Sequence, residues 1–242
     1  MERTHSTDLA NGRDLRPYSS ERFGAAVAAA LLEIEAVHIR PAEPFSLTSG
    51  LLSPVYVDCR KVISYPKQRC LIIDAAVATI REQLVVTELD AIAGGETAGI
   101  PYAAWIADRL NLPMLYIRKK PKGFGRNAQI EGSFAEGARV LLVEDLATNG
   151  GSKEVFVKAL RDAGAIVDTS LVVFFYNYGQ DARLPLLEDL GVKLLSLATW
   201  NEILAQAATS LNSSPAEIAE VKLFLSDKEK WSAARGGPKQ TL

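Results

Sequence analysis

Apolar and polar residues along this chain follow two rhythms, which divide most of it into predicted strands and helices. Uninterrupted apolar runs predict strands over 91–93, 114–118, 140–143, within 166–176 and over 192–197. Apolar residues spaced three or four positions apart predict helices over 21–37, 66–84, 99–110, 152–163, 184–190, 199–209 and 213–224. Strands without polar alternation are typical of parallel sheets, which are buried on both faces. Because these strands alternate with helices, the pattern predicts an α/β fold with a doubly wound, mainly parallel sheet.

The segment between the first two predicted helices follows neither rhythm. Residues 45–49 and 55–59 are short strand-like runs, joined by the turn-forming residues 50–54. This pattern predicts a small hairpin outside the main sheet. His38, at the end of the first helical pattern, is interpreted as a partly buried surface residue.

The two ends of the chain have weaker patterns. Polar residues of mixed charge come before Ser19 and Ser20, which can cap the first helix. The expected divisions are a flexible tail over 1–18, a single domain over 19–230 with a hood at about 36–62 and a core at about 66–209, and a loose C-terminal tail over 233–242.

Composition and charge exclude several classes of protein. The formal net charge of -2 favours neither a nucleic-acid nor a membrane partner, and no segment approaches the roughly 20 apolar residues of a membrane span. With His5 and His38 as the only histidines, a Ser-His-Asp or Cys-His hydrolase is poorly supported. Cys59 and Cys70 form no CxxC pair, and no secretory signal is seen, so we expect a reduced, cytoplasmic protein.

The strongest candidate for chemistry directly follows the predicted strand 140–143. The segment reads Glu144, Asp145, Leu146, Ala147, Thr148, Asn149, Gly150, Gly151 and Ser152. Glycines let the backbone approach a ligand closely, and a helix start offers free N–H groups to a phosphate. Acids beside a phosphate make sense if they face sugar hydroxyls or a hydrated divalent cation. The alternative is an ordinary helix start, where acids are favoured. A Walker loop and a GxGxxG fingerprint are both absent.

This string resembles the motif with which type I phosphoribosyltransferases bind 5-phosphoribosyl 1-diphosphate (PRPP). The resemblance implies that Thr148–Ser152 hold the 5-phosphate and that Glu144 and Asp145 face the ribose hydroxyls. It also implies the type I phosphoribosyltransferase fold, an α/β sheet with a small hood over the site.

Three further segments resemble the orotate phosphoribosyltransferase family. Residues 45–50 with 53–58 are similar to its hood, 94–101 to its pyrophosphate loop, which includes Glu96 and Thr97, and 116–125 to its mobile catalytic loop. The resemblance implies transfer of phosphoribose from PRPP to orotate, with Mg²⁺ as cofactor. It further implies a homodimer, because the mobile loop reaches the neighbouring subunit's site, and a cis peptide bond between Glu96 and Thr97.

The chemistry of the mobile loop supports this function independently. Arg118, Lys119, Lys120 and Lys122 place four cations within five residues. Such a charge can neutralise a departing pyrophosphate, and Mg²⁺ can share the task. Lys122 is the residue expected nearest to the pyrophosphate.

The chain departs from the better-known family members at several charged positions. Thr48 and Ala98 stand where those enzymes have lysines, Phe124 replaces a histidine, and Asn177 falls near an orotate-contacting arginine. The candidates to substitute for these missing charges are Arg60, Lys61 and Arg126.

Other functions share parts of this pattern. A phosphoribosyltransferase for another base has the same phosphate cradle. A PRPP-sensing regulator generally carries a nucleic-acid-binding module, but residues 1–60 contain neither a helix-turn-helix pattern nor a basic face, and the loop lysines favour catalysis. A Rossmann-like dehydrogenase lacks the glycine fingerprint.

Overall fold

The computed structural model describes residues 18–20, 22–123, 129–179, 184–209 and 213–238. Its centre is a seven-stranded sheet in the order β1-β11-β10-β9-β6-β7-β8. Every neighbouring pair is parallel except β7 and β8. The strands are β1 Tyr18–Ser19, β6 Ala91–Gly95, β7 Met114–Ile117, β8 Ile130–Glu131, β9 Val140–Ala147, β10 Thr169–Phe175 and β11 Lys193–Thr199. The predicted mainly parallel sheet is therefore confirmed.

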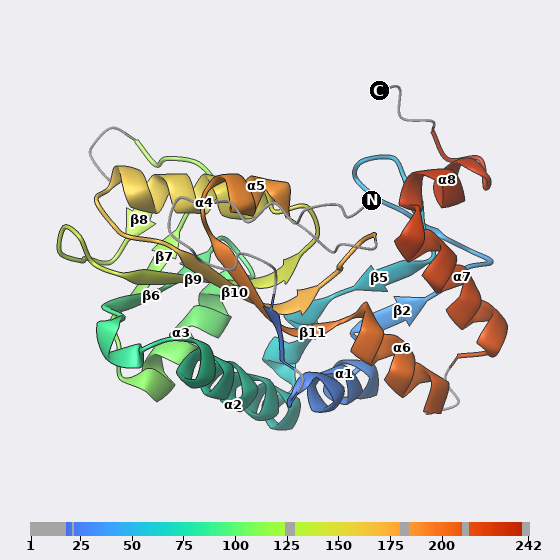
Figure 1. Ribbon diagram of the computed structural model, residues 1–242, viewed down its shortest axis with the longest axis horizontal. Helices are drawn as coiled ribbons and strands as arrows, with labels where there is room; N and C mark the ends of the chain where they lie inside the picture. Colours follow the sequence, from blue (N-terminus) through green and yellow to red (C-terminus); the bar gives the residue numbers. More distant parts are fainter. Residues whose placement is uncertain (1–17, 21, 124–128, 180–183, 210–212, 239–242) are drawn as a thin grey trace, which may run out of the picture.

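Helices cover both faces of the sheet (Figure 1), because successive strand residues point to opposite sides. On β9, Leu141 and Val143 belong to one buried apolar cluster, with α1, α2, α3 and α6. Val140 and Leu142 belong to the other cluster, with α4 and α5. These helices are α1 Gly24–Glu33, α2 Pro66–Gln83, α3 Gly99–Leu110, α4 Gly151–Asp162, α5 Pro185–Asp189 and α6 Trp200–Thr209, with 3-10 turns η1 Cys59–Ser64 and η2 Val86–Glu88. The doubly wound arrangement is thus confirmed as well.

The hood consists of two small antiparallel pairs. β2 (Val37–Ile39) pairs with β5 (Val55–Val57), and β3 (Phe45–Ser46) pairs with β4 (Leu52–Ser53). The prediction of one hairpin between 45–49 and 55–59 is therefore wrong.

Local geometry explains why the hood differs from that prediction. Gly50, at φ 85°, closes a tight turn, so the chain reverses before β5 begins. The first helix ends at Glu33, and Glu35 has a φ of 53°. His38 consequently lies in β2 rather than at the end of a helix, and it is partly buried, as interpreted.

Two C-terminal helices pack beside the hood (Figure 1). α7 (Pro215–Ser226) begins with a capping box between Ser214 and Glu217, while α8 (Lys228–Ala233) has no counterpart in the apolar pattern of the sequence. The Ser232 hydroxyl of α8 accepts a hydrogen bond of 2.9 Å from the Leu52 amide of β4. The end of the chain therefore supports the hood.

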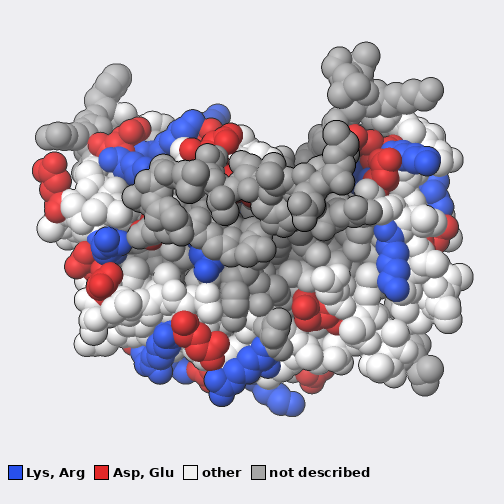
Figure 2. Space-filling model, in the orientation of Figure 1, with Lys and Arg blue, Asp and Glu red and all other residues white. Residues whose placement is uncertain are grey.

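Figure 2 shows acidic and basic side chains interspersed on the face that it displays. Among the described helices, none is long and apolar enough to cross a membrane.

Candidate active site

A cleft of about 580 Å³ lies at the carboxyl ends of the central strands, beneath the hood. In open α/β sheets this edge is where ligands bind. The cleft is lined by Leu47, Thr48, Ser53, Tyr56, Val57, Asp58, Arg60, Glu96, Thr97, Ala98, Lys119, Glu144, Asp145, Leu146, Thr148, Ser152, Tyr176 and Tyr178. Another cleft, of about 300 Å³, lies near the opposite edge, beside Arg139 and Asp168, and contains none of the predicted ligand-binding side chains.

The two candidate acids belong to strand β9, which continues four residues beyond the predicted end at 143. Glu144 is 6% exposed, and Ser152 Oγ donates a 3.3 Å hydrogen bond to Glu144 Oε2. Asp145 Oδ1 accepts a 2.8 Å hydrogen bond from the Leu146 amide. Desolvation by burial raises the pKa of both carboxyls, so that their ionisation depends on a nearby cation.

That cation is Lys153, to which no pattern in the sequence points. Its side chain is 2% exposed, and its ammonium lies 3.6 Å from Glu144 Oε2. The ammonium also donates a 2.6 Å hydrogen bond to the Leu146 carbonyl oxygen. The pKa of Lys153 lies below its usual value, because burial lowers it and the two acids offset this effect only in part. Lys153 thus joins the acid pair to the start of α4.

The start of α3 packs closely on Glu144. Gly99 approaches so tightly that an added Cβ would collide with the Val143 carbonyl oxygen and with Glu144 Oε1. A Cβ added to Gly95, at the end of β6, would likewise collide with Glu144 Oε1 and with the Phe156 ring. Glycine is required at both positions to let Glu144 lie this close to the ends of β6 and α3.

The turn between β9 and α4, where the sequence predicts a phosphate cradle, opens onto the cleft. Gly150, at φ 84°, is the residue from which α4 starts, and Asn149 Oδ1 accepts a hydrogen bond from the Gly151 amide. Thr148 and Ser152 line the cleft, whereas Ala147 is buried in the sheet. The hydroxyls and the helix start therefore face the same space.

Two loops from β6 and β7 close one side of the cleft. The Glu96–Thr97 peptide bond is cis, as the resemblance implied. Glu96 Oε2 accepts a 2.7 Å hydrogen bond from the Lys119 amide, so the two loops are connected.

The structure separates the four loop cations. Lys119 lines the cleft, but Arg118 pairs with Glu131 at 2.6 Å and does not line it. Lys120 and Lys122 are exposed and lie outside the described lining of the cleft. Phe124 and Arg126 lie outside the described residues.

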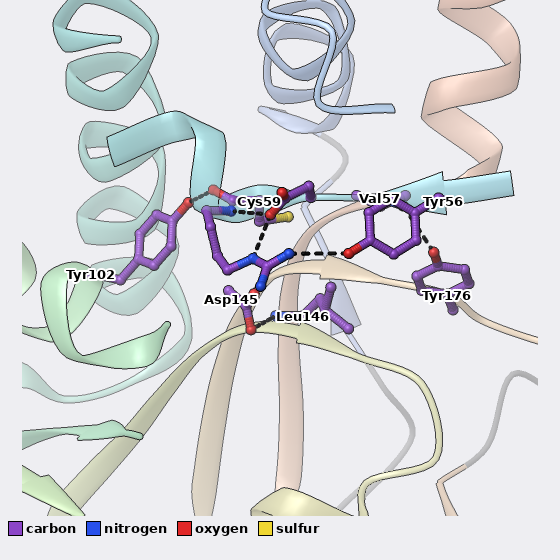
Figure 3. Close-up of polar contacts among 9 residues, drawn as sticks. Tyr56, Val57, Cys59, Tyr102, Asp145, Leu146 and Tyr176 are labelled. Carbon is purple, nitrogen blue, oxygen red and sulfur yellow. Dashed lines mark hydrogen bonds and ion pairs between the residues drawn. The ribbon is translucent and has the colours of Figure 1, made fainter. Parts of the chain in front are cut away.

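The opposite side of the cleft is formed by the hood and the end of β10. Figure 3 shows Asp145 with Tyr102 on one side and Tyr56 and Tyr176 on the other. Tyr176 Oη accepts a 3.1 Å hydrogen bond from the Val57 amide, and its ring packs 5.3 Å from that of Tyr178. The sequence singled out the loop after 176 but not these tyrosines, because aromatic residues next to a buried strand are usually core.

Asn177, between the two tyrosines, does not line the cleft. Its Oδ1 accepts a 3.3 Å hydrogen bond from the Trp200 amide, and its φ is 36°. The side chain therefore points to the start of α6. Tyr178, in contrast, lines the cleft, and its ring also contacts the Phe224 ring. The Phe224 ring in turn packs on that of Trp231.

Known proteins resemble this chain over most of its length. It is 52% identical over 215 residues to an orotate phosphoribosyltransferase of Cereibacter sphaeroides, covering 89% of this chain and 92% of that protein. The crystal structure of orotate phosphoribosyltransferase from Aeropyrum pernix is 34% identical, with a TM-score of 0.65, covering 76% of this chain and 98% of that one. Leishmania donovani UMP synthase is 28% identical, with a TM-score of 0.70, covering 83% of this chain but 42% of that longer chain. No family model matches the sequence.

Proposed function

The chain belongs to the orotate phosphoribosyltransferase family, and we propose that the cleft described above is its active site. The enzyme transfers the 5-phosphoribosyl group from PRPP to orotate, giving orotidine 5'-phosphate and pyrophosphate in pyrimidine biosynthesis. One observation carries the assignment of the site: side chains from the ends of β6, β7 and β9, which the sequence predicted separately, line a single cleft.

The proposed roles follow the order of the strands. Thr148 to Ser152 hold the 5-phosphate at the start of α4, because a helix start attracts anions and both Thr148 and Ser152 line the cleft there. Glu144 and Asp145 bind the ribose hydroxyls. Glu96, Thr97 and Lys119 surround the pyrophosphate, while the hood, with Thr48 and Tyr56, covers the base.

Positioning and charge stabilisation account for the chemistry of transfer. Orotate N1 attacks C1 of the ribose with inversion, through an oxocarbenium-like transition state, and the C1–O bond to pyrophosphate breaks. Because the ring nitrogen can be presented as an anion, no strong base is needed. The loop cations stabilise the charge that develops on the leaving group.

Mg²⁺ is proposed as a cofactor that enters together with PRPP. Mg²⁺ usually binds through one or two carboxylates together with substrate phosphates and water. The described cleft offers Glu96, Glu144 and Asp145 as carboxylates, which fits this mode, and among the described residues no three-ligand metal cluster of its own is found. When bound, the ion neutralises charge on the diphosphate.

Replacing Asp145 with Asn should weaken the binding of the ribose and of Mg²⁺. Turnover that is unchanged from wild type across a Mg²⁺ titration would contradict this role of Asp145.

A homodimer is proposed from the placement of the loop cations. Lys122 is exposed and lies outside the cleft of its own subunit, so it is available to a second copy. An apolar contact surface is offered by the exposed side chains of Ile63 and Tyr65. Next to them, the Arg69 guanidinium lies over the Trp105 ring and donates a hydrogen bond to the Ile63 carbonyl oxygen. The proposal also includes a single domain over residues 19–230 and a cytoplasmic location, which fits the free thiols of Cys59 and Cys70.

The function is tested by the PRPP-dependent loss of orotate absorbance in the presence of Mg²⁺. Wild-type enzyme should consume orotate and release pyrophosphate in equal amounts, and should not use uracil or purine bases at a comparable rate. Pyrophosphate release with another base but not with orotate would overturn the base assignment. PRPP binding without turnover of any base would instead indicate a sensing protein.

Lys122→Ala should lower kcat by about 100-fold, the usual cost of losing one group that stabilises developing charge. Lys222→Ala, an exposed lysine of α7, is the control.

A further inference from the structure

Orotate carries its carboxylate on C6, the ring carbon adjacent to N1. Since N1 forms the bond to C1 of the ribose, the carboxylate must come to rest close to the ribose. In this cleft the proposed ribose site is formed by Glu144 and Asp145, which are themselves acids. An anion placed there needs a cation between it and the acid pair, because like charges in a partly buried site repel strongly.

The described lining of the cleft contains two cations, Arg60 and Lys119. Lys119 belongs to the loop after β7 and is connected to Glu96, on the side proposed for pyrophosphate. Arg60 belongs to η1, directly after the hood strand β5, and lines the cleft together with Asp145.

The other residues considered for this role are placed elsewhere. The Lys61 ammonium donates a 3.0 Å hydrogen bond to the Glu35 carbonyl oxygen and does not line the described cleft. Asn177 is directed to the Trp200 amide. Arg60 is therefore the described cation on the base side of the cleft.

The Arg60 guanidinium is held in place by two neighbours from the hood. Its Nε donates a 2.6 Å hydrogen bond to Asp58 Oδ1, and its Nη2 donates a 3.0 Å hydrogen bond to Tyr56 Oη. The Tyr56 ring, shown in Figure 3 beside the strand, is itself packed 5.6 Å from the Phe45 ring. Nη1 donates to no described residue, and the side chain is 58% exposed. A fixed guanidinium with free N–H groups is suited to a planar carboxylate.

From these observations we propose that Arg60 binds the C6 carboxylate of orotate, with Asp58 and Tyr56 positioning its guanidinium. This inference rests on the proposed function and adds the residue that selects orotate over bases without a carboxylate. Asp58 also accepts a 3.1 Å hydrogen bond from the Arg60 amide, so the same carboxylate fixes both the backbone and the side chain.

Steady-state kinetics of Arg60→Met and Arg60→Lys test this assignment. Arg60→Met should raise the KM for orotate by about 10- to 100-fold, the range expected for loss of a charge-assisted hydrogen bond, while the KM for PRPP changes by less than about threefold. Arg60→Lys keeps the charge but loses the fork and should fall between wild type and Arg60→Met. The preference for orotate over uracil should fall with the orotate KM. Lys61→Met, the neighbouring cation outside the cleft, is the matched control and should behave as wild type.

Each other result has a definite meaning. An orotate KM in Arg60→Met within about twofold of wild type would overturn the assignment, as would equal increases in the KM for orotate and for PRPP. If Arg60→Met does not fold, Arg60→Lys carries the test, and a wild-type orotate KM and base preference in that folded variant would overturn it. A wild-type enzyme that does not turn over orotate would overturn the proposed function itself, which is a separate result.

Discussion

Lys153 shows how one residue can determine the electrostatics of the site without lining the cleft. Its ammonium contacts Glu144 and the Leu146 carbonyl oxygen in a setting that excludes water. A buried ion pair contributes little by itself, but removing one partner leaves an uncompensated charge. We therefore expect Lys153 to be needed both for folding and for keeping Glu144 ionised.

Lys153→Met should lower the free energy of unfolding by about 3–5 kcal/mol, because Glu144 is left buried without its cation. Urea unfolding of the variant measures this loss. The double variant Glu144→Gln with Lys153→Met should recover most of the stability but remain impaired in PRPP turnover, since Glu144 is missing. Equal stability of wild type and Lys153→Met would contradict the role of the pair.

Single residues of the site differ in how readily the sequence reveals them. Glu144 and Asp145 could be predicted because two acids after an apolar strand are unusual. Lys153 could not, because a polar residue early in a helix normally faces solvent, and here the tight fit of α4 on β9 buries it. Arg60 was a candidate, but its selection over Lys61 depends on the direction of each side chain, which a sequence does not give.

At the scale of elements, the junction of β6, β9 and α3 sets the distance between the acids and the pyrophosphate loop. Gly99 lies directly against Glu144, so any side chain at this position moves either α3 or the acid. Both elements were predicted from the sequence, but the predicted strand ended at residue 143, because charged residues usually mark the beginning of a loop. Burial against Lys153 and the glycines is what allows β9 to continue.

Gly99→Ala should lower kcat/KM for PRPP by about 100-fold, because displacement of the acid by about 1 Å is enough to disturb a positioned substrate. Ala104→Ser, on the exposed side of the same helix, should leave it unchanged. Steady-state kinetics with PRPP as the varied substrate compares the two. A fully active Gly99→Ala would show that the close approach is not required.

The support of the hood by α8 leads to a separate prediction. Deleting residues 228–242 removes Ser232, the acceptor for the Leu52 amide, and Trp231, which packs on Phe224. The KM for orotate should rise by about tenfold, with a smaller change for PRPP, because the hood, which is proposed to cover the base, is no longer held in position. Deletion of 239–242 alone is the control. An equal change for both substrates would argue against a specific role of α8 at the hood.

At the scale of the whole molecule, the proposed dimer divides each active site between two chains. Lys122→Ala and Asp145→Asn subunits should each be nearly inactive as homodimers. If Lys122 acts in the partner's site, mixed dimers contain one site with both wild-type residues. Random mixing in equal amounts should then restore about a quarter of wild-type activity, because about half of the dimers are mixed and each has one working site.

Subunit exchange followed by the orotate assay measures this recovery. Mixing two preparations of the same variant is the control and should restore nothing. Absence of recovery despite confirmed exchange would place Lys122 in its own subunit's site.

The contact of Tyr178 with Phe224, and of Phe224 with Trp231, has an optical consequence. Tyr178 also packs on Tyr176, whose ring lies 5.7 Å from that of Trp200. Excitation absorbed at the tyrosine in the cleft can therefore pass to tryptophans at either end of this aromatic row. Neither Trp200 nor Trp231 lines the cleft. We therefore expect a ligand on the base side to change tryptophan emission without touching an indole, which makes intrinsic fluorescence a measure of base binding.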